Sequence, residues 1–480
     1  MACYPFYQYL GVTFEGMHIW RQADCLSLSK TYSIFDNSFF EPRLFNLGFS
    51  GNGKTGSDFP LFYYLYSFFA ETPFFESAFK LCNLSIAIGG LLALFNVMKT
   101  HINHISAFVI SLMFLTSSTY VFYAGNYLMN VPSLSLTFIS VFLFSLYFRT
   151  KKTHWFIAGI LVSIISILIK PTALSHYIVL TFIIVLKSWI DLSYIRYSKL
   201  SLGILIVVIL IMLAWVFYIK MYNNHNNSGM FLTGILPIWS MSKTEILNVI
   251  LEFKRRFGLF YNPYVLCVIP IAFLISSINL ILKRKIILVH VAYIIYCLGF
   301  IAFFILFYQV LDQHDYYLIN WLVLVPFGLV ILYSIVPVSG FNYNIFNTVL
   351  IIVLIDSIFF CNLRMTDRYS GWRNELYTSY IMLMEEDYNN EFQSHLSFQD
   401  PIYIPSDKSI NISLYTLNTV GWTGYNKLSA SNLLMLKSQN LKYILLKKNE
   451  TKPDFLVKNS TEFNVLKKGT HFDLYIIKLK

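Results

Sequence analysis

The sequence is poor in charged residues. Only 13% of its 480 residues are Asp, Glu, Lys or Arg, whereas a soluble globular protein carries roughly 25%. Its six cysteines are scattered, without the spacing of a zinc site or of a disulfide framework. No cleavable signal peptide and no repeat of solenoid period is evident. These deficits argue against a zinc module, a disulfide framework and a solenoid, and they indicate that much of the surface faces something other than water.

Long hydrophobic runs take the place of the missing charge. The chain is 56% hydrophobic, and its 44 Phe and 34 Tyr are typical of rings at bilayer interfaces. About ten segments are long and apolar enough to span a bilayer. The predicted spans lie at roughly 79–98, 105–123, 131–148, 155–170, 174–190, 200–219, 259–282, 286–308, 319–338 and 345–363. The sequence therefore predicts an all-α polytopic membrane bundle.

Three regions organise the chain. Residues 1–77 form a mixed first loop, residues 78–363 form the transmembrane bundle with a polar loop at 220–258, and residues 364–480 form a water-compatible tail. We predict a small α/β tail with strands at 402–404, 412–417, 442–446 and 472–477 and a helix at 429–439. We interpret this tail as a stabilising cap, and a sensor or acceptor-binding role stays open.

The Lys and Arg residues predict the orientation in the membrane. The basic connections are 149–152, 196–199 and 283–285, and they alternate with cation-poor connections such as 124–130 and 309–318. The positive-inside rule places the basic set in the cytoplasm, which explains the net charge of +11 better than nucleic-acid binding does. The first loop, the polar loop and the tail then share the extracytoplasmic face. Because the first loop must itself cross the membrane, we expect that a first helix is missing.

Two stretches need a local interpretation. Residues 242–257 are amphipathic, which fits a helix lying in the interface or a loop helix packed on the bundle. Residues 48–55, GFSGNGKT, match the P-loop pattern literally. A P-loop needs a helix directly after it to hold phosphate, and Pro60 disfavours a helix at Phe59. We interpret this motif as a glycine-rich loop without a nucleotide.

A polar cluster occupies the stretch HIWRQAD, residues 18–24. On a helix, Arg21 and Asp24 lie three residues apart and can pair, while Gln22 falls on the His18 side. Such a cluster at a membrane surface could hold a phosphate with Arg21 and use Asp24 as a base. The spacing alone favours the plainer interpretation, an interfacial ion pair that contributes little free energy.

Two further acidic positions precede aromatic runs. Asp58 stands before Pro60 in SDFPLFYYL, where it could equally cap a helix that the proline begins. In DQHDYYL, His314 and Asp315 could bind a phosphate or orient a substrate hydroxyl, and Tyr316 suits the bilayer interface.

Single polar residues also occur within the spans. Lys170 precedes a proline near a membrane surface, so it could snorkel or reach a lipid phosphate. Asp356, His176 and His290 are the ionisable groups that a transport pathway would need. They are sparse, which makes transport the weaker alternative.

With these motifs the sequence resembles the C-type membrane glycosyltransferase (GT-C) superfamily, in particular the bacterial branch akin to protein mannosyltransferases and lipid A aminoarabinose transferases. The resemblance rests on order: HIWRQAD is followed by KTGSDFPLFYYL, YLMNVPSL, LIKPTAL and QHDYYL. The tail segment NISLYTLNTVGWTGYN, residues 411–426, also resembles such proteins. The ordered set covers most of the chain.

The resemblance implies transfer of a sugar from a polyprenyl-phosphate donor to a glycolipid, polysaccharide or protein acceptor, with inversion and without a cofactor or metal. The enzyme would act on the extracytoplasmic face of the bacterial inner membrane, among membrane lipids and without nucleic acid. Asp24 would be the general base and Asp58 the second acid. The candidate substrate-binding residues are His18, Arg21, Gln22, Lys170, His314, Asp315 and Tyr316.

The sequence departs from the family pattern at two positions. Better-known members carry an Asp-Glu pair where this chain has Arg21-Gln22, so Glu15 stays an alternative catalytic acid. Many relatives have an acid where this chain has Ser133. The alternatives to a glycosyltransferase are an envelope polysaccharide or lipid transporter, flippase or polymerase, and a non-catalytic membrane partner.

Overall fold

The chain divides into two compact units. The computed structural model describes residues 4, 6–13, 16–231, 234–258, 260–282, 287–336, 340–370, 374–426, 436–450 and 463–477. The membrane unit comprises Met1–Leu10, Phe79–Val216 and Gly234–Arg368, and the loop–tail unit comprises Gly11–Ala78, Phe217–Thr233 and Tyr369–Lys480. The predicted first loop and tail, treated above as separate regions, therefore fold as one unit.

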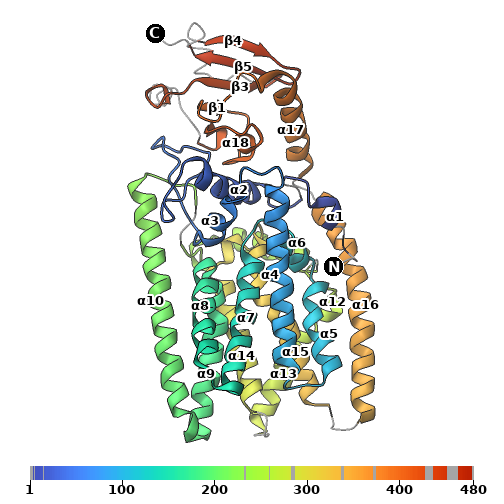
Figure 1. The fold of residues 1–480 in the computed structure, drawn as a ribbon. Coiled ribbons are helices and arrows are strands. Elements are labelled where there is room, and N and C mark those ends of the chain that lie inside the picture. The colour runs from blue at the N-terminus through green and yellow to red at the C-terminus, as the bar shows by residue number, and fades with distance from the viewer. Residues whose placement is uncertain are drawn as a thin grey trace. The chain divides into compact units, whose positions relative to one another are not determined.

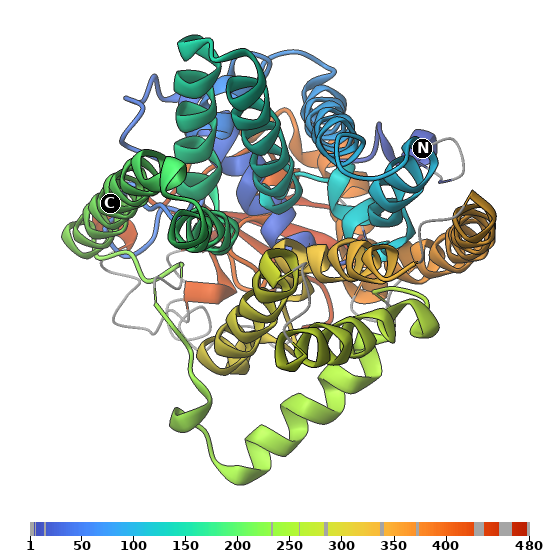
Figure 2. The same cartoon turned by 90° about the horizontal axis from the view of Figure 1, so that it is seen from below.

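The long helices of the membrane unit run side by side (Figure 1), and Figure 2 looks along them. Its helices are α1 (Phe6–Tyr9), α4 (Phe75–Met98), α5 (His104–Leu112), α6 (Ser118–Ala124), α7 (Asn130–Thr150), α8 (Thr153–Ile169), α9 (Leu174–Ile190), α10 (Ile195–His225), α11 (Lys243–Phe257), α12 (Pro263–Leu266), α13 (Val268–Ile281), α14 (Ile287–Leu306), α15 (Leu324–Ser334) and α16 (Gly340–Ser370). The 3-10 helix η6 (Asp315–Val323) leads into α15.

Within the described residues, eight helices are long and apolar enough to cross a membrane, or nine if one bent pair counts as a single span. Each predicted span coincides with an apolar helix, but the second is bent by 79° and Thr153–Ile169 has only 17 residues. The bend lies at Ser117, whose extended backbone ends one helix and whose hydroxyl accepts from Tyr120 N–H to cap the next. The prediction of a polytopic membrane bundle is confirmed.

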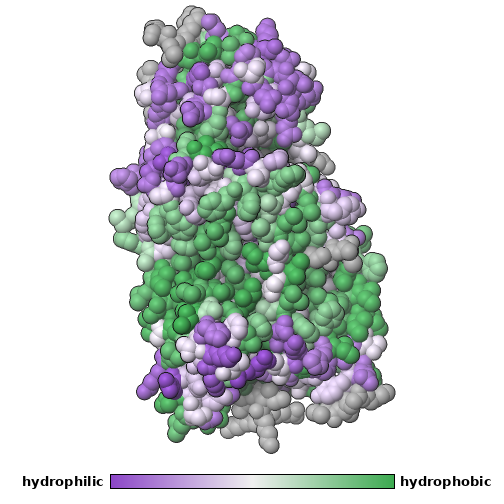
Figure 3. Space-filling model, in the orientation of Figure 1, coloured by the Kyte–Doolittle hydropathy of each residue, from purple (hydrophilic) through white to green (hydrophobic). Residues whose placement is uncertain are grey.

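The outward faces of the membrane helices are apolar. On α10, Ile206, Leu210 and Leu213 recur at helical spacing and are each more than half exposed. Figure 3 shows hydrophobic residues over the middle of the membrane unit and hydrophilic residues at its lower end. An apolar surface of this extent is stable against lipid but would aggregate in water.

The predicted amphipathic segment is helix α11. Its first turn is closed by a capping box, in which Ser242 and Glu245 each bond the other's backbone N–H. Phe253 is buried and packs on Phe304 of α14, with ring centroids 5.0 Å apart, whereas Leu251 is exposed. One face of α11 therefore packs on the bundle, and its other apolar residues remain available to an interface.

The loop–tail unit combines short helices with a five-stranded sheet (Figure 1). Its elements are α2 (Ile19–Ile34), α3 (Leu61–Ser67), α17 (Asn374–Asp387), α18 (Ile412–Thr416), β1 (Ile402–Ile404), β2 (Gly421–Thr423), β3 (Tyr443–Lys447), β4 (Phe463–Lys468) and β5 (Phe472–Ile477). The strand order is β2-β1-β3-β5-β4, with parallel pairs around β1 and antiparallel pairs around β5. The fully buried Trp422 anchors the sheet core.

The tail prediction is partly wrong. The strands predicted at 402–404, 442–446 and 472–477 are present, and the sheet also contains β2 and β4, but residues 412–417 form helix α18 instead of a strand. Ile412 N–H donates to Ser409 Oγ at 3.0 Å, and Ser413 N–H donates to Asp407 Oδ2 at 2.9 Å. These side chains satisfy the first N–H groups of a helix and so start one. The helix predicted at 429–439 lies mostly outside the described residues.

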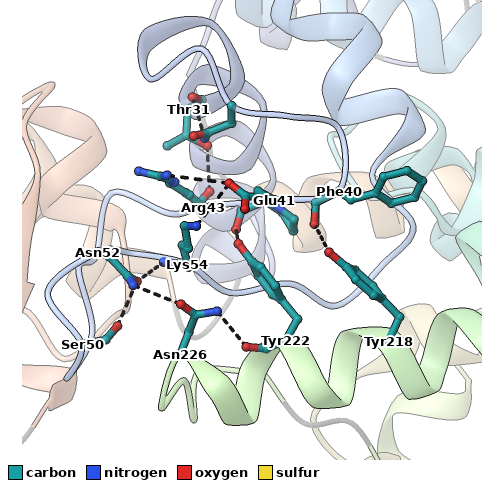
Figure 4. A network of polar contacts seen from close by, with 12 residues as sticks. Thr31, Phe40, Glu41, Arg43, Ser50, Asn52, Lys54, Tyr218, Tyr222 and Asn226 are labelled. Atoms are coloured by element: carbon teal, nitrogen blue, oxygen red, sulfur yellow. Dashed lines mark hydrogen bonds and ion pairs between the residues drawn. The ribbon is translucent and has the colours of Figure 1, made fainter.

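The P-loop-like stretch 48–55 is a loop without a following helix, as predicted, because the next helix, α3, begins at Leu61. Lys54 is turned to Glu41, with 3.2 Å between its Nζ and the carboxylate (Figure 4). The Lys54 N–H donates to Asn52 Oδ1 at 2.8 Å. The lysine that would contact phosphate in a P-loop instead stabilises this loop.

The C-terminal end of α10 holds the same loop region (Figure 4). Tyr218 donates to the carbonyl of Phe40 at 2.6 Å, and Tyr222 donates to that of Pro42 at 3.1 Å. Asn52 donates to Asn226 Oδ1 at 3.0 Å. These bonds fix the C-terminal end of α10 and the next residue, Asn226, against the first loop.

Candidate functional site

Arg21 joins two carboxylates in the loop–tail unit. Its Nη2 lies 2.9 Å from Asp58 Oδ2 and 3.0 Å from Ser57 Oγ, and its Nη1 lies 3.9 Å from Asp24 Oδ2. The three charged side chains are only 15%, 13% and 6% exposed for Arg21, Asp58 and Asp24. The pair expected from the i,i+3 spacing is present, but the closer partner of Arg21 is Asp58.

Further groups hold Arg21 and Asp58 in place. Tyr63 donates to Asp58 Oδ2 at 3.2 Å, and the Arg21 guanidinium lies 4.9 Å from the ring centroid of Phe231, a cation–π distance. The helix α3 starts after Pro60, whose position has no side-chain cap hydrogen bond. The interpretation of Asp58 as a capping residue stays a prediction.

Asp24 is buried, with 4% of its surface exposed. Its Oδ1 accepts a 2.7 Å hydrogen bond from Asn411 Nδ2, and Asn411 Oδ1 accepts from Asn46 N–H at 3.0 Å. Burial raises the pKa of Asp24 to about 6, although the charge of Arg21 and the bond from Asn411 act in the opposite direction. Asp24 is thus a carboxylate whose pKa lies above the usual range of aspartate.

The other residues of the first polar cluster have local partners. His18 precedes α2 with a left-handed backbone, φ 58°. Gln22 is 1% exposed, and its Nε2 donates to the Met17 carbonyl at 2.8 Å. Glu15 lies outside the described residues. The role of these three residues in substrate binding or catalysis stays a prediction.

A pocket of about 860 Å³ also lies within the loop–tail unit. Trp20 and Tyr425 line it. Trp20 is four residues before Asp24 on α2, so the two share a helix face. Burial raises the pKa of Tyr425, and the charge of Asp24 raises it further. Two lining residues of the pocket, Trp20 and Tyr425, are therefore linked to Asp24, the first by a shared helix face and the second by its charge.

In the membrane unit, Asp315 lies at the centre of a buried network. Its Oδ2 is 2.7 Å from Arg368 Nη1, and its Oδ1 accepts from Tyr123 Oη at 2.5 Å. Arg368 also donates to Ser118 Oγ at 2.9 Å and to Thr119 Oγ1 at 2.6 Å. Both oxygens of Asp315 are engaged, so this placement favours a structural role that ties α6 to α16.

The remaining predicted residues also belong to the membrane unit. His314 packs beside Tyr316, with ring centroids 5.2 Å apart, and Asn130 donates to the Tyr316 carbonyl at 3.0 Å. Lys170 ends α8 with an extended backbone before the turn of Pro171. Their proposed contact with a lipid phosphate stays a prediction.

The polar residues inside the spans pair with neutral groups. Asp356 accepts from Asn262 at 2.9 Å and from the Tyr264 hydroxyl. His176 bonds Tyr296 at 2.8 Å, and His290 bonds Ser276 and Asn279. Among the described residues, no group of three or more His, Cys, Asp or Glu could hold a metal ion.

Local sequence patterns do not predict the residues that contact Asp24 and Arg21 from distant segments. Asn411 and Tyr425 come from the tail, and Phe231 comes from the loop after α10. The resemblance of residues 411–426 marks the first two as a segment, but no local spacing connects them with Asp24.

The fold is that of known membrane glycosyltransferases. The sequence matches no protein-family model and no curated protein sequence. ArnT from Cupriavidus metallidurans bound to undecaprenyl phosphate is similar in structure, with a TM-score of 0.60 and 9% identity over 98% of this chain and 95% of ArnT. The apo state of the same ArnT has a TM-score of 0.54 and 10% identity, over 95% of this chain and 93% of ArnT. An oligosaccharyltransferase from Archaeoglobus fulgidus has a TM-score of 0.55 and 12% identity, over 91% of this chain and 64% of the oligosaccharyltransferase. The predicted resemblance to the GT-C superfamily is confirmed as a likeness of fold.

Removal of Arg368 should destabilise the membrane unit. Arg368→Met leaves the buried Asp315 carboxylate without its cation, which costs about 3–5 kcal/mol. We expect a lower Tm for the purified protein in detergent, and partial recovery in the double variant Arg368→Met/Asp315→Leu. The control is Arg364→Met, whose pair with Asp367 is largely exposed and worth about 1 kcal/mol or less. An equal fall in Tm in the two single variants would show that the buried ion pair contributes no more to stability than the exposed one.

Proposed function

We propose that this protein is an integral membrane glycosyltransferase that moves a sugar from a polyprenyl-phosphate donor to an acceptor of the bacterial envelope. The observation that carries the proposal is Asp24, a buried carboxylate with a pKa of about 6 held beside Arg21. The likeness of fold supports the reaction class, and the undecaprenyl phosphate bound to one similar structure supports the donor.

In the proposed reaction, Asp24 is the general base. Asn411 occupies its Oδ1, so Oδ2 is the oxygen that takes the proton from the acceptor hydroxyl. The hydroxyl oxygen then attacks the anomeric carbon, and the bond from that carbon to the phosphate oxygen breaks with its electron pair on the phosphate. Attack from the side opposite the leaving group inverts the configuration. A base with a pKa near the working pH is well matched to this task.

Arg21 supplies a positive charge to the site, and Asp58 holds this cation in a fixed orientation. The leaving phosphate gains negative charge, and a fixed cation offsets such charge best when its orientation is set beforehand. Asp58 and Ser57 orient the Arg21 guanidinium, which makes Arg21 the candidate for the lipid phosphate. Lys170 and His314 are the further candidates from the membrane unit.

We place the site on the extracytoplasmic face of the inner membrane. This location rests on the positive-inside rule, which assigns the basic connections 149–152 and 196–199 to the cytoplasm and the first loop and the tail, which belong to the loop–tail unit, to the other side. A donor linked to a polyprenyl lipid suits that compartment, since it carries its own leaving group and needs no soluble nucleotide.

Loss of the Asp24 carboxylate should abolish most of the transfer. We expect Asp24→Asn to lower the rate by about 10²–10⁴-fold, the usual contribution of a general base. Asp58→Asn should lower it less, because Arg21 loses its closest partner but the base stays. Mass spectrometry of envelope glycolipids from cells with and without the gene first identifies the product. Transfer of the sugar is then measured in membranes that contain equal amounts of each variant.

The matched control for these variants is Glu41→Gln. Glu41 is an acid of the same unit that pairs with Lys54 (Figure 4), whereas Arg21 pairs with Asp58 and Asp24. We expect transfer close to that of the unaltered protein. Full transfer in both Asp24→Asn and Asp58→Asn would overturn the proposal.

The rate should depend on pH through Asp24. The base works when deprotonated, so transfer should rise with pH, reach half of its maximum near pH 6 and level off above that. The bond from Asn411 lowers the pKa of Asp24; its removal in Asn411→Ala should therefore move the acidic limb to higher pH. Asn411→Asp, which adds a like charge, should move it further.

The control for the pH profile is Asn224→Ala, at an exposed asparagine near the end of α10. Its profile should match that of the unaltered protein. An acidic limb that stays in place in both Asn411 variants would show that Asp24 is not the titrating base.

A further inference from the structure

The pocket beside Asp24 has a composition suited to a sugar. Its volume of about 860 Å³ falls within the usual range of ligand sites. Trp20 and Phe49 line it with 41% and 42% of their surfaces exposed, and Asn227 adds an amide. A sugar ring presents C–H groups on its faces and hydroxyls at its edge, so it needs both aromatic surface and hydrogen-bonding groups.

The Trp20 ring is held in a fixed orientation. Tyr377 packs edge-on against it, with ring centroids 5.8 Å apart. Trp20 also belongs to α2, whose next turn is buried. An exposed ring that is fixed from behind loses little conformational entropy when a ligand stacks on it.

Other lining residues of the pocket are held by local contacts. Asn426 is 5% exposed and exchanges hydrogen bonds with Asn46. These bonds hold the segment that also contains its chain neighbour Tyr425. Gly48 has a φ of +63°, and a Cβ there would lie 2.9 Å from Met230 Cε. Both Gly48 and Met230 line the pocket, so two loops approach each other closely at its wall.

The charge of the lining has one sign. Lys408 is the one cation among the described lining residues, which include no acid. Lys408 is exposed, and it forms no ion pair within the described part of the chain. A cation without a partner in an aromatic pocket is available to an anionic ligand.

We propose that this pocket binds an acidic sugar unit of the acceptor, with its ring against Trp20 and its carboxylate or phosphate on Lys408. The inference rests on the proposed function, because it takes the hydroxyl that Asp24 deprotonates to belong to this unit. Tyr425 connects the two, because it lines the pocket and the charge of Asp24 raises its pKa. The tail is then an acceptor-binding part and not only a stabilising cap.

The test measures binding and not transfer. The full chain in detergent is titrated with galacturonic acid and glucose 6-phosphate, and with their neutral counterparts galactose and glucose, by saturation-transfer NMR. We expect the acidic probes to bind more tightly. Lys408→Gln should weaken the acidic probes about tenfold and leave the neutral probes unchanged, whereas Trp20→Ala should weaken all four.

Matched controls come from the membrane unit. Lys243→Gln removes an exposed lysine, and Trp239→Ala removes an exposed tryptophan, both outside the pocket. Neither should change binding. Each variant must keep the Tm of the unaltered protein, so that a loss of binding does not reflect a loss of fold.

The outcomes separate this inference from the proposed function. Asp24→Asn should keep the acidic probe bound while transfer is lost. Retained transfer in Asp24→Asn would contradict the proposed reaction. Equal binding of acidic and neutral probes, with no effect of Lys408→Gln, would overturn the proposal that the ligand is anionic. Absence of binding by all four probes to the folded, unaltered protein would overturn the sugar site itself.

Discussion

One cation lies beside a buried carboxylate, Asp24, and a partly buried one, Asp58, in the loop–tail unit. Arg21 lies 2.9 Å from Asp58 and 3.9 Å from Asp24, so its charge compensates Asp58 more fully. Burial then raises the pKa of Asp24, and a neutral amide, Asn411, is its closest partner. A carboxylate that is incompletely compensated accepts a proton more readily than one in a tight ion pair. The unequal sharing of Arg21 therefore separates the two acids into an orienting group and a candidate base.

The sequence predicts features that depend on local spacing. The apolar runs locate every span, because about 20 apolar residues are needed to cross a bilayer in a helix. The i,i+3 spacing likewise predicts the pair of Arg21 and Asp24. The same reasoning fails at 412–417, where an alternation typical of strands is overruled by caps from Asp407 and Ser409. Side-chain caps that precede a short segment decide its structure more strongly than its own pattern does.

The site itself is built from segments that the sequence does not connect. Asn411 contacts Asp24 across 387 positions, and Phe231 reaches Arg21 from the region after α10. No periodicity links such residues, and only the ordered family motifs marked 411–426 as relevant. The first loop and the tail also bury each other's polar groups, as in the bonds between Asn46 and Asn426. Because unpaired buried amides are costly, the two segments depend on each other for folding.

The position of Lys408 also bears on the chemistry at Asp24. An acidic sugar in the pocket would add a negative charge near Asp24 and raise its pKa, since like charges disfavour ionisation. At neutral pH a higher pKa would leave less of the carboxylate in the form that accepts a proton. A cation in the same pocket offsets this charge when it pairs with the ligand. A single contact between Lys408 and the ligand would thus serve recognition and oppose the rise in the pKa of Asp24.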